Sequence, residues 1–191
     1  MKVLQIGCGG IGSYFTENLF NSIEGGHIDE PIELTIADDD MVESKQVLWQ
    51  NFTLSEVGLS KAESMGVRFK CSIKGRINTK TDLKGFDLIV LCVDNDVTRH
   101  LVVEYCHKMN KQFIDLRATG RKVFAMPKLK TAQENLKFID ESDLKEYSCQ
   151  DKEDLNSGWI QIGNKVVAMI GVQMLMNHLR GHNNHVHNYL I

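Results

Sequence analysis

Residues 2–12 read Lys-Val-Leu-Gln-Ile-Gly-Cys-Gly-Gly-Ile-Gly, an apolar run that passes directly into a glycine-rich turn. A second apolar run, residues 32–37, ends in Asp38, Asp39 and Asp40. A strand, a glycine turn, a helix and a second strand with an acidic tip are typical of a βαβ unit that binds nucleotides. The glycines of the turn are Gly7, Gly9, Gly10 and Gly12. The sequence therefore predicts nucleotide binding by an α/β fold.

These residue types suit a phosphate and a ribose. Glycines let the backbone turn sharply and approach a phosphate without Cβ clashes. The helix that follows directs its free N–H groups and its positive dipole end at the same point. An acidic residue at the strand tip, here Asp38, can accept hydrogen bonds from ribose hydroxyls.

The rest of the chain alternates strand and helix signals. Residues 86–93 are the strongest expected strand, because 88–93 is a continuous apolar run, as a central parallel strand requires. Residues 163–180 are apolar nearly all round, which predicts a helix buried on several sides, with a second subunit as one way to cover it. Other expected helices are 11–23, 56–67 capped by Ser55, and 97–109, and other expected strands are 67–73, 75–78, 112–116, 122–126 and 158–162. We expect a Rossmann-like, mainly parallel sheet with helices on both faces, and a mixed C-terminal portion is left open.

The polar segments complete a single domain over residues 1–191. Residues 127–157 are rich in charged and amide side chains and are interpreted as a crossover loop. Residues 181–191 form a polar tail with three histidines, His182, His185 and His187. These histidines could bind a metal, but we interpret them as part of a polar tail.

Composition excludes several classes of protein. A net charge of −3 and a pI near 6.2 argue against nucleic acid as the main partner. The five cysteines are scattered and never form a Cys-x-x-Cys pair, which indicates a reducing compartment, and neither a disulfide framework nor a cysteine zinc site is expected. A strand that starts at residue 2 argues against a signal peptide, and the longest apolar stretch, 166–176, is shorter than the roughly 20 residues that span a bilayer. We expect a cytoplasmic protein without a membrane partner.

Four motifs in order resemble the ThiF/MoeB-like adenylating enzyme family, the superfamily of ubiquitin-activating enzymes. Residues 7–13 are similar to its Gly-x-Gly-Gly-(Leu/Ile)-Gly loop, and residues 36–42 to its Asp-x-Asp-x-Val segment. Residues 57–63 match its Gly-x-x-Lys-Ala/Val-Glu helix start, and residues 91–99 its Asp-Asn-x-x-x-Arg motif.

The resemblance implies an activity and its reactants. The family activates a C-terminal carboxylate of a ubiquitin-like or sulfur-carrier protein or of a peptide, through attack on the α-phosphate of Mg-ATP. It implies ATP and Mg²⁺ as cofactors, and a homodimer.

The resemblance also assigns roles. The backbone of Gly9 and Gly10 would meet the nucleotide, and Asp38 would hold the ribose. Asp40 would orient the site or contact the substrate end, and Lys61 would neutralise phosphate charge. Asp94 would hold Mg²⁺ through one oxygen. The remaining nucleotide-contacting positions that the resemblance implies are Gly7, Gly12, Gln46, Gln50 and Asn95.

The sequence departs from the family pattern at one phosphate contact. The family's Asn-x-x-Arg-Gln corresponds here to Gln46-Val-Leu-Trp49-Gln50, and Trp49 cannot replace a guanidinium charge. Catalysis could therefore be slower, rerouted through Arg117 or Arg121, or absent. The family's paired Cys-x-x-Cys motifs are absent from the sequence, so no zinc is expected.

Other interpretations stay open at this point. Trp49 favours a catalytically reduced ATP-binding subunit or module of an activating enzyme. The glycine spacing and Asp38 are also compatible with an NAD(P)-dependent oxidoreductase. Lys61 could be an ordinary surface lysine, and Asp94 could cap the helix at 97. Cys149 could be a reactive thiol, although its acidic neighbours would raise the pKa of that thiol.

Overall fold

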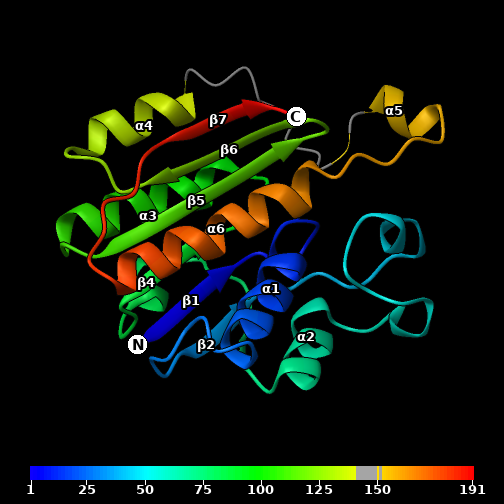
Figure 1. The fold of residues 1–191 in the computed structure, drawn as a ribbon, viewed down its shortest axis with the longest axis horizontal. Helices are drawn as coiled ribbons and strands as arrows, with labels where there is room; N and C mark the ends of the chain where they lie inside the picture. Colours follow the sequence, from blue (N-terminus) through cyan, green and yellow to red (C-terminus); the bar gives the residue numbers. More distant parts are fainter. Residues whose placement is uncertain (141–149, 151) are drawn as a thin grey trace.

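The fold is a seven-stranded sheet in the order β3-β2-β1-β4-β5-β6-β7 (Figure 1). It is seen in a computed structural model that describes residues 1–140, 150 and 152–191. The strands are β1 (Lys2–Ile6), β2 (Glu33–Ala37), β3 (Ser72–Lys74), β4 (Leu88–Leu91), β5 (Gln112–Thr119), β6 (Lys122–Pro127) and β7 (His187–Leu190). The pairs from β3 to β5 are parallel, and β6 and β7 are antiparallel. The expected Rossmann-like, mainly parallel sheet is confirmed, and its C-terminal portion is mixed.

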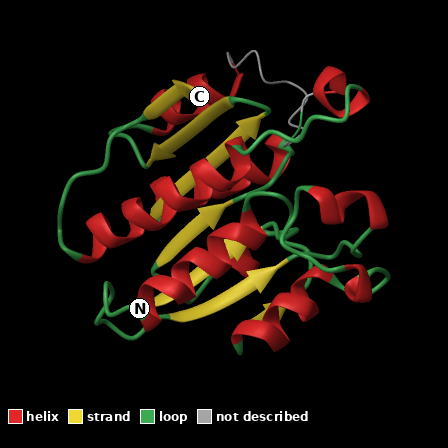
Figure 2. Cartoon of the chain, turned by 45° about the vertical axis from the view of Figure 1, so that its right-hand side comes forward, coloured by secondary structure: helices red, strands yellow, loops and turns green. Residues whose placement is uncertain are grey.

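Helices cover both faces of this sheet, as predicted. The helices are α1 (Gly12–Glu24), α2 (Lys61–Phe69), α3 (Asp96–Lys108), α4 (Ala132–Asp140), α5 (Lys152–Asn156) and α6 (Gly163–Leu179). Helices α1 and α6 lie side by side on one face, with α2 beside α1 (Figures 1 and 2). Helices α3 and α4 pack on the other face. None of the helices among the described residues has the length and apolarity that crossing a membrane requires.

The central strand β4 shows why the sheet is buried on both sides. Leu88 and Val90 join the core under α1 and α6, whereas Ile89 and Leu91 join the core under α3. All four side chains are buried. A continuous apolar run is what a parallel strand between two helical layers needs.

The start of α2 differs from the prediction. Residues 61–67 are helical as predicted, but the expected start at residue 56 and the expected cap Ser55 are wrong. Ser60 is the N-cap, and its Oγ accepts a hydrogen bond from the Glu63 amide at 3.3 Å. Ser55 lies instead in a short 3₁₀ helix, η2 (Leu54–Glu56). The shift makes Lys61 the first residue of α2.

The expected crossover loop over 127–157 is partly helical. Thr131 and Glu134 cap the start of α4 reciprocally, with amide-to-side-chain distances of 2.9 and 3.2 Å. Ile139 then packs into the core beneath α3. The apolar residues of this polar segment therefore anchor a helix to the sheet.

Three strand or tail predictions are also corrected. Residues 158–162 form no strand, because the Gln161 amide bonds to the side chain of Gln150 and not to a neighbouring strand. Of the strands expected at 67–73 and 75–78, only Ser72–Lys74 is observed. The tail 181–191 is not only polar coil, because part of it adds β7 to the edge of β6.

Candidate active site

The glycine loop is held in shape by the strand before it. Gly7 has φ +93°, a left-handed conformation that favours glycine, and its amide donates to Ala37 O at 2.9 Å. The buried side chain of Gln5 donates from Nε2 to the carbonyls of Gly7 and Gly12, each at 3.0 Å. A Cβ on Gly12 would lie 2.1 Å from Gly7 O. These contacts fix the loop where β1 passes into α1.

A cavity of about 320 Å³ opens above this loop, at the C-terminal ends of β1, β2, β4 and β5. Strand order reverses between β1 and β4, and this is the point where open α/β sheets bind ligands. The predicted residues that line the cavity are Gly7, Gly9, Gly10, Asp38, Asp40, Gln46, Gln50, Lys61, Asp94 and Asn95. Gly12 is not among the lining residues and instead shapes the loop from behind. Positions from four separate motifs therefore converge on one hollow.

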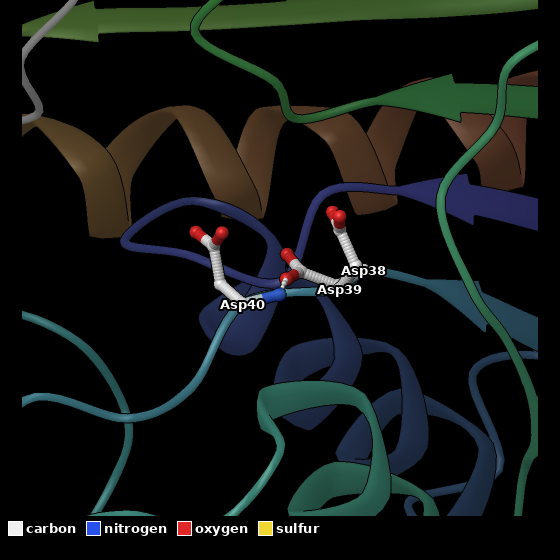
Figure 3. A group of neighbouring side chains, drawn as sticks. All are labelled: Asp38, Asp39 and Asp40. Carbon is white, nitrogen blue, oxygen red and sulfur yellow. Dashed lines mark hydrogen bonds between the residues drawn. The ribbon is translucent and has the colours of Figure 1, made fainter.

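Three carboxylates stand side by side on the β2 wall (Figure 3). Asp38 accepts hydrogen bonds from the Cys8 amide at 2.5 Å and the Asp40 amide at 2.8 Å, which tie β2 to the glycine loop. Burial raises the pKa of Asp38 and outweighs the lowering effect of those hydrogen bonds and of Lys61. Asp39 pairs with Arg76 at 3.7 Å on the cavity rim. Asp38 is the least exposed of the three, and its hydrogen bonds hold its carboxylate in place at the cavity wall.

Lys61 is a buried cation and not a surface lysine. Its side chain is 3% exposed, and its Nζ lies 2.9 Å from Oδ2 of Asp40, whose side chain is 68% exposed. The Lys61 amide also donates to Asp40 O at 3.0 Å. Burying an ammonium is costly unless it is paired, so the ion pair holds this charge at the cavity wall.

Asp94 and Asn95 follow β4 and differ in role: Asn95 caps a helix, whereas Asp94 faces the cavity. Asn95 caps α3, and its Oδ1 accepts a hydrogen bond from the Thr98 amide at 2.9 Å. The interpretation of Asp94 as the cap is therefore wrong. Asp94 is exposed and lines the cavity, so its carboxylate can meet a ligand. Its oxygen donors are the kind that Mg²⁺ prefers.

The segment that departs from the family pattern forms another wall. Gln46 Oε1 accepts from the Glu43 amide at 3.2 Å, in the capping box of η1 (Ser44–Leu48). Gln50 is buried, and its Oε1 has no hydrogen-bond partner within the described protein. Trp49 lines the cavity beside them. This wall therefore offers amides and an indole, without a cation.

Two arginines to which the family resemblance assigned no nucleotide contact also line the cavity. Arg99, from the first turn of α3, and Arg117, from β5, are both fully buried. Both bind Asp115, at 3.1 Å from Arg99 Nε and 2.9 Å from Arg117 Nε. Of the two arginines suggested for rerouting, Arg117 is at the cavity, whereas Arg121 is exposed and is not among its lining residues. The signal for Arg99 was present as the last residue of the fourth motif.

Asn164 ties the glycine loop to the Trp49 segment. From the first turn of α6, its Nδ2 donates to Gly10 O at 3.0 Å and to Trp49 O at 2.6 Å. Its side chain is fully buried. An amide side chain just before the apolar run of α6 was the signal available for this role.

We expect Asn164→Ala to lower the free energy of unfolding by about 1–3 kcal/mol, because the buried carbonyl of Gly10 and the half-buried carbonyl of Trp49 lose their donor. Urea denaturation measures this. Gln173→Ala, on the exposed side of the same helix, is the control and should stay within about 0.5 kcal/mol of wild type. Equal urea midpoints for the two variants would contradict this role of Asn164.

The described cysteines are reduced thiols that serve packing. Cys8, Cys92 and Cys106 are buried, and Cys71 is half-buried. Burial raises the pKa of the Cys106 thiol to about 12 and that of Cys71 to about 11, which disfavours the reactive thiolate. Cys149, the candidate reactive thiol, lies outside the described residues.

Comparison with protein families gives one match over the whole chain. The model described as the ThiF family matches residues 1–191. Among curated proteins, the adenylyltransferase and sulfurtransferase MOCS3 of Drosophila grimshawi is 28% identical over 124 residues, which are 59% of this chain and 26% of that protein.

Solved structures share the fold over nearly the whole chain. E. coli MccB with ATP superposes with a TM-score of 0.65 at 18% identity, covering 99% of this chain and 63% of MccB. The microcin C7 biosynthetic enzyme MccB in complex with N-formylated MccA gives a TM-score of 0.68 at 19% identity, with 99% and 64% coverage. The chain thus spans about a quarter of the matched curated relative and less than two thirds of these structures.

Proposed function

Since the chain belongs to the ThiF family, we propose that it is an ATP-dependent adenylyltransferase. Its substrate would be the C-terminal carboxylate of a ubiquitin-like or sulfur-carrier protein or of a peptide, activated as an acyl adenylate. One observation carries the proposal: the glycine loop, Asp38, Lys61 and Asp94 line a single cavity where strand order reverses. The relatives support it, because MOCS3 is named an adenylyltransferase and MccB has been solved with ATP.

The reaction makes simple demands on this cavity. A carboxylate oxygen attacks the α-phosphorus, an acyl O–P bond forms, and the P–O bond to pyrophosphate breaks, with the electron pair leaving on pyrophosphate. The two reactants must be held in line, and the phosphate charge must be neutralised. Bare amides of Gly9 and Gly10 suit a phosphate, and Lys61 supplies a fixed positive charge. Asp94 would hold Mg²⁺, which when bound adds further neutralisation of the phosphates.

A second candidate function is a catalytically reduced ATP-binding subunit or module. Trp49 favours it, because the cavity wall has an indole where the family pattern has an arginine. Such a protein would bind ATP and release no pyrophosphate with any carboxylate offered.

Assembly and location are also proposals. Apolar side chains at the start and on the outer side of α6 are exposed, with Ile162 at 56% and Met169 at 52%. A second copy that covers them would make a homodimer. The cytoplasm is the proposed location, because the five cysteines are scattered along the sequence without a Cys-x-x-Cys pair, as is typical of a reducing compartment.

We expect ATP with Mg²⁺ to raise the melting temperature, whereas NAD and NADP should not. A ligand at about 100 times its Kd adds roughly 2.7 kcal/mol, and each kcal/mol shifts the Tm of a chain of this size by about 2–4 °C.

Lys61→Ala should reduce the rise in melting temperature that ATP causes in the wild type, because the phosphates lose a fixed cation. The melting temperature of this variant without ligand should change little. The lost ion pair is offset because Asp40 is already exposed to water and because a buried ammonium, which is costly to desolvate, is removed.

Lys130→Ala, at an exposed lysine away from the cavity, is the matched control and should keep the full shift. A shift with NAD or NADP and none with ATP would instead support the oxidoreductase alternative. No shift with ATP would sink the proposed function.

A further inference from the structure

The cavity has a second cationic wall on the side away from Lys61. It consists of Arg99 and Arg117, whose side chains are 0% and 1% exposed. Both line the cavity, and both bind the fully buried carboxylate of Asp115. Asp115 and Arg117 alternate with Ile114 and Leu116 along β5, so both point to the α3 face of the sheet. Two guanidinium groups from different elements therefore meet at one carboxylate.

Each guanidinium is held in a fixed orientation. Arg99 also donates to Val93 O, the carbonyl just before Asp94, and its Nη1 lies 3.3 Å from Asp96 Oδ1. Arg117 donates to Phe138 O of α4 at 3.4 Å, and its guanidinium stacks 5.1 Å from the centre of the Phe124 ring. Side chains fixed in this way lose little entropy when a ligand binds.

The position of this wall follows from the strand order. Asp38 and Lys61 stand at the β2 side of the glycine loop, and the arginines stand at the β4–β5 side. A nucleotide whose ribose faces β2 and whose phosphates pass over the loop extends toward the arginines. The planar fork of a guanidinium matches two phosphate oxygens.

The arginine wall offers a replacement for the arginine that the family pattern has at the position of Trp49. The segment with Trp49 presents no cation to the cavity, whereas β5 presents Arg117. A guanidinium at the cavity wall is thus supplied by a different strand. The 46–50 wall is left with an aromatic surface.

We propose that Arg117, together with Arg99, binds the triphosphate of ATP, and that Asp115 is the positioning residue that orients both guanidinium groups. This rests on the proposed function, because it presupposes that the cavity takes ATP. It assigns to β5 a phosphate contact that the sequence pattern lacks at position 49.

The test compares ATP with adenosine, each measured by calorimetric titration in the presence of Mg²⁺. Arg117→Gln should weaken ATP binding by about 10- to 100-fold, the loss expected for one charge-assisted contact. Adenosine, which has no phosphate, should bind the variant and the wild type equally. Arg121→Gln, at the exposed arginine in the next turn, is the control and should leave both affinities unchanged.

Arg117→Lys and an NMR measurement keep the test valid if Arg117→Gln does not fold. Lysine keeps the positive charge but cannot make the two parallel hydrogen bonds of a guanidinium group, so the affinity for ATP should fall by less than in Arg117→Gln. In the folded wild type, the Arg117 Nε–H resonance, assigned by its absence in Arg117→Lys, should shift with ATP and not with adenosine.

Equal loss of ATP and adenosine affinity, or an Arg117 resonance unmoved by ATP, would overturn the phosphate contact and leave a structural role only. Wild-type protein that binds no ATP would overturn the proposed function itself, so the two failures are distinct.

Discussion

Gly12→Ala is expected to prevent stable folding of the domain. A Cβ at this position would lie 2.1 Å from the carbonyl oxygen of Gly7 and 2.8 Å from Nε2 of Gln5. Real Cβ atoms do not approach backbone that closely, and the loop cannot yield without breaking the hydrogen bonds that Gln5 donates to it. Because α1 starts at Gly12 and packs on α6, displacement of the loop reaches the core. We expect the free energy of unfolding to fall by more than about 4 kcal/mol, as measured by urea denaturation of soluble protein.

Gly9→Ala is the matched control within the same loop. The nearest atom to its Cβ would be Gln50 Nε2 at 3.8 Å, an ordinary contact, and Gly9 is not in the left-handed region. This variant should fold with wild-type stability, yet its methyl group enters the cavity at the place proposed for the phosphates. ATP should therefore raise its melting temperature less than that of wild type. Comparable stability of Gly12→Ala and Gly9→Ala would contradict this prediction, because the loop could then move to accommodate a Cβ at residue 12.

The glycine loop and β4 were predictable because their signals are local. Four glycines after an apolar run require a sharp turn, and the apolar run at 88–93 requires burial on both faces. Lys61 and Asp94 were predicted through motif resemblance, and both line the cavity. Periodicity could not show that Lys61 is buried, because its burial depends on the ion pair with Asp40 across the cavity wall.

The remaining features depend on contacts between distant segments. Ser55 and Ser60 both have cap chemistry, and the choice is made by pairing of residues 41 and 42 with residues 58–60. The strand β7 has no apolar alternation and exists because β6 offers an open edge. A charged Asp115 inside a buried strand is tolerated because Arg99 arrives from α3 to pair with it. Single-sequence patterns carry no information about such partners.

Asp115→Asn is the other substitution with a large expected effect. It should lower the free energy of unfolding by about 3–5 kcal/mol at pH 7, because two buried guanidinium groups would lose their shared carboxylate. Burial alone would raise the pKa of Asp115, but the charges and hydrogen bonds of Arg99 and Arg117 outweigh it and lower the pKa. A carboxyl whose pKa is lowered by folding contributes stability that is fully present above its unfolded pKa, near 3.8, and is lost as the pH falls through the folded value.

Urea denaturation of both proteins from pH 7 to pH 3 therefore isolates this carboxyl. The gap between wild type and Asp115→Asn should be constant down to about pH 4 and narrow below it. Asp29→Asn, at an exposed carboxylate, should follow the wild type at every pH within about 0.5 kcal/mol. A gap that stays constant to pH 3 would mean that the variant acts through packing, and a gap that widens on acidification would contradict the assigned direction of the pKa shift. Because the same carboxylate orients the arginines at the cavity, the stability of this cluster and the proposed phosphate contact have a common physical origin.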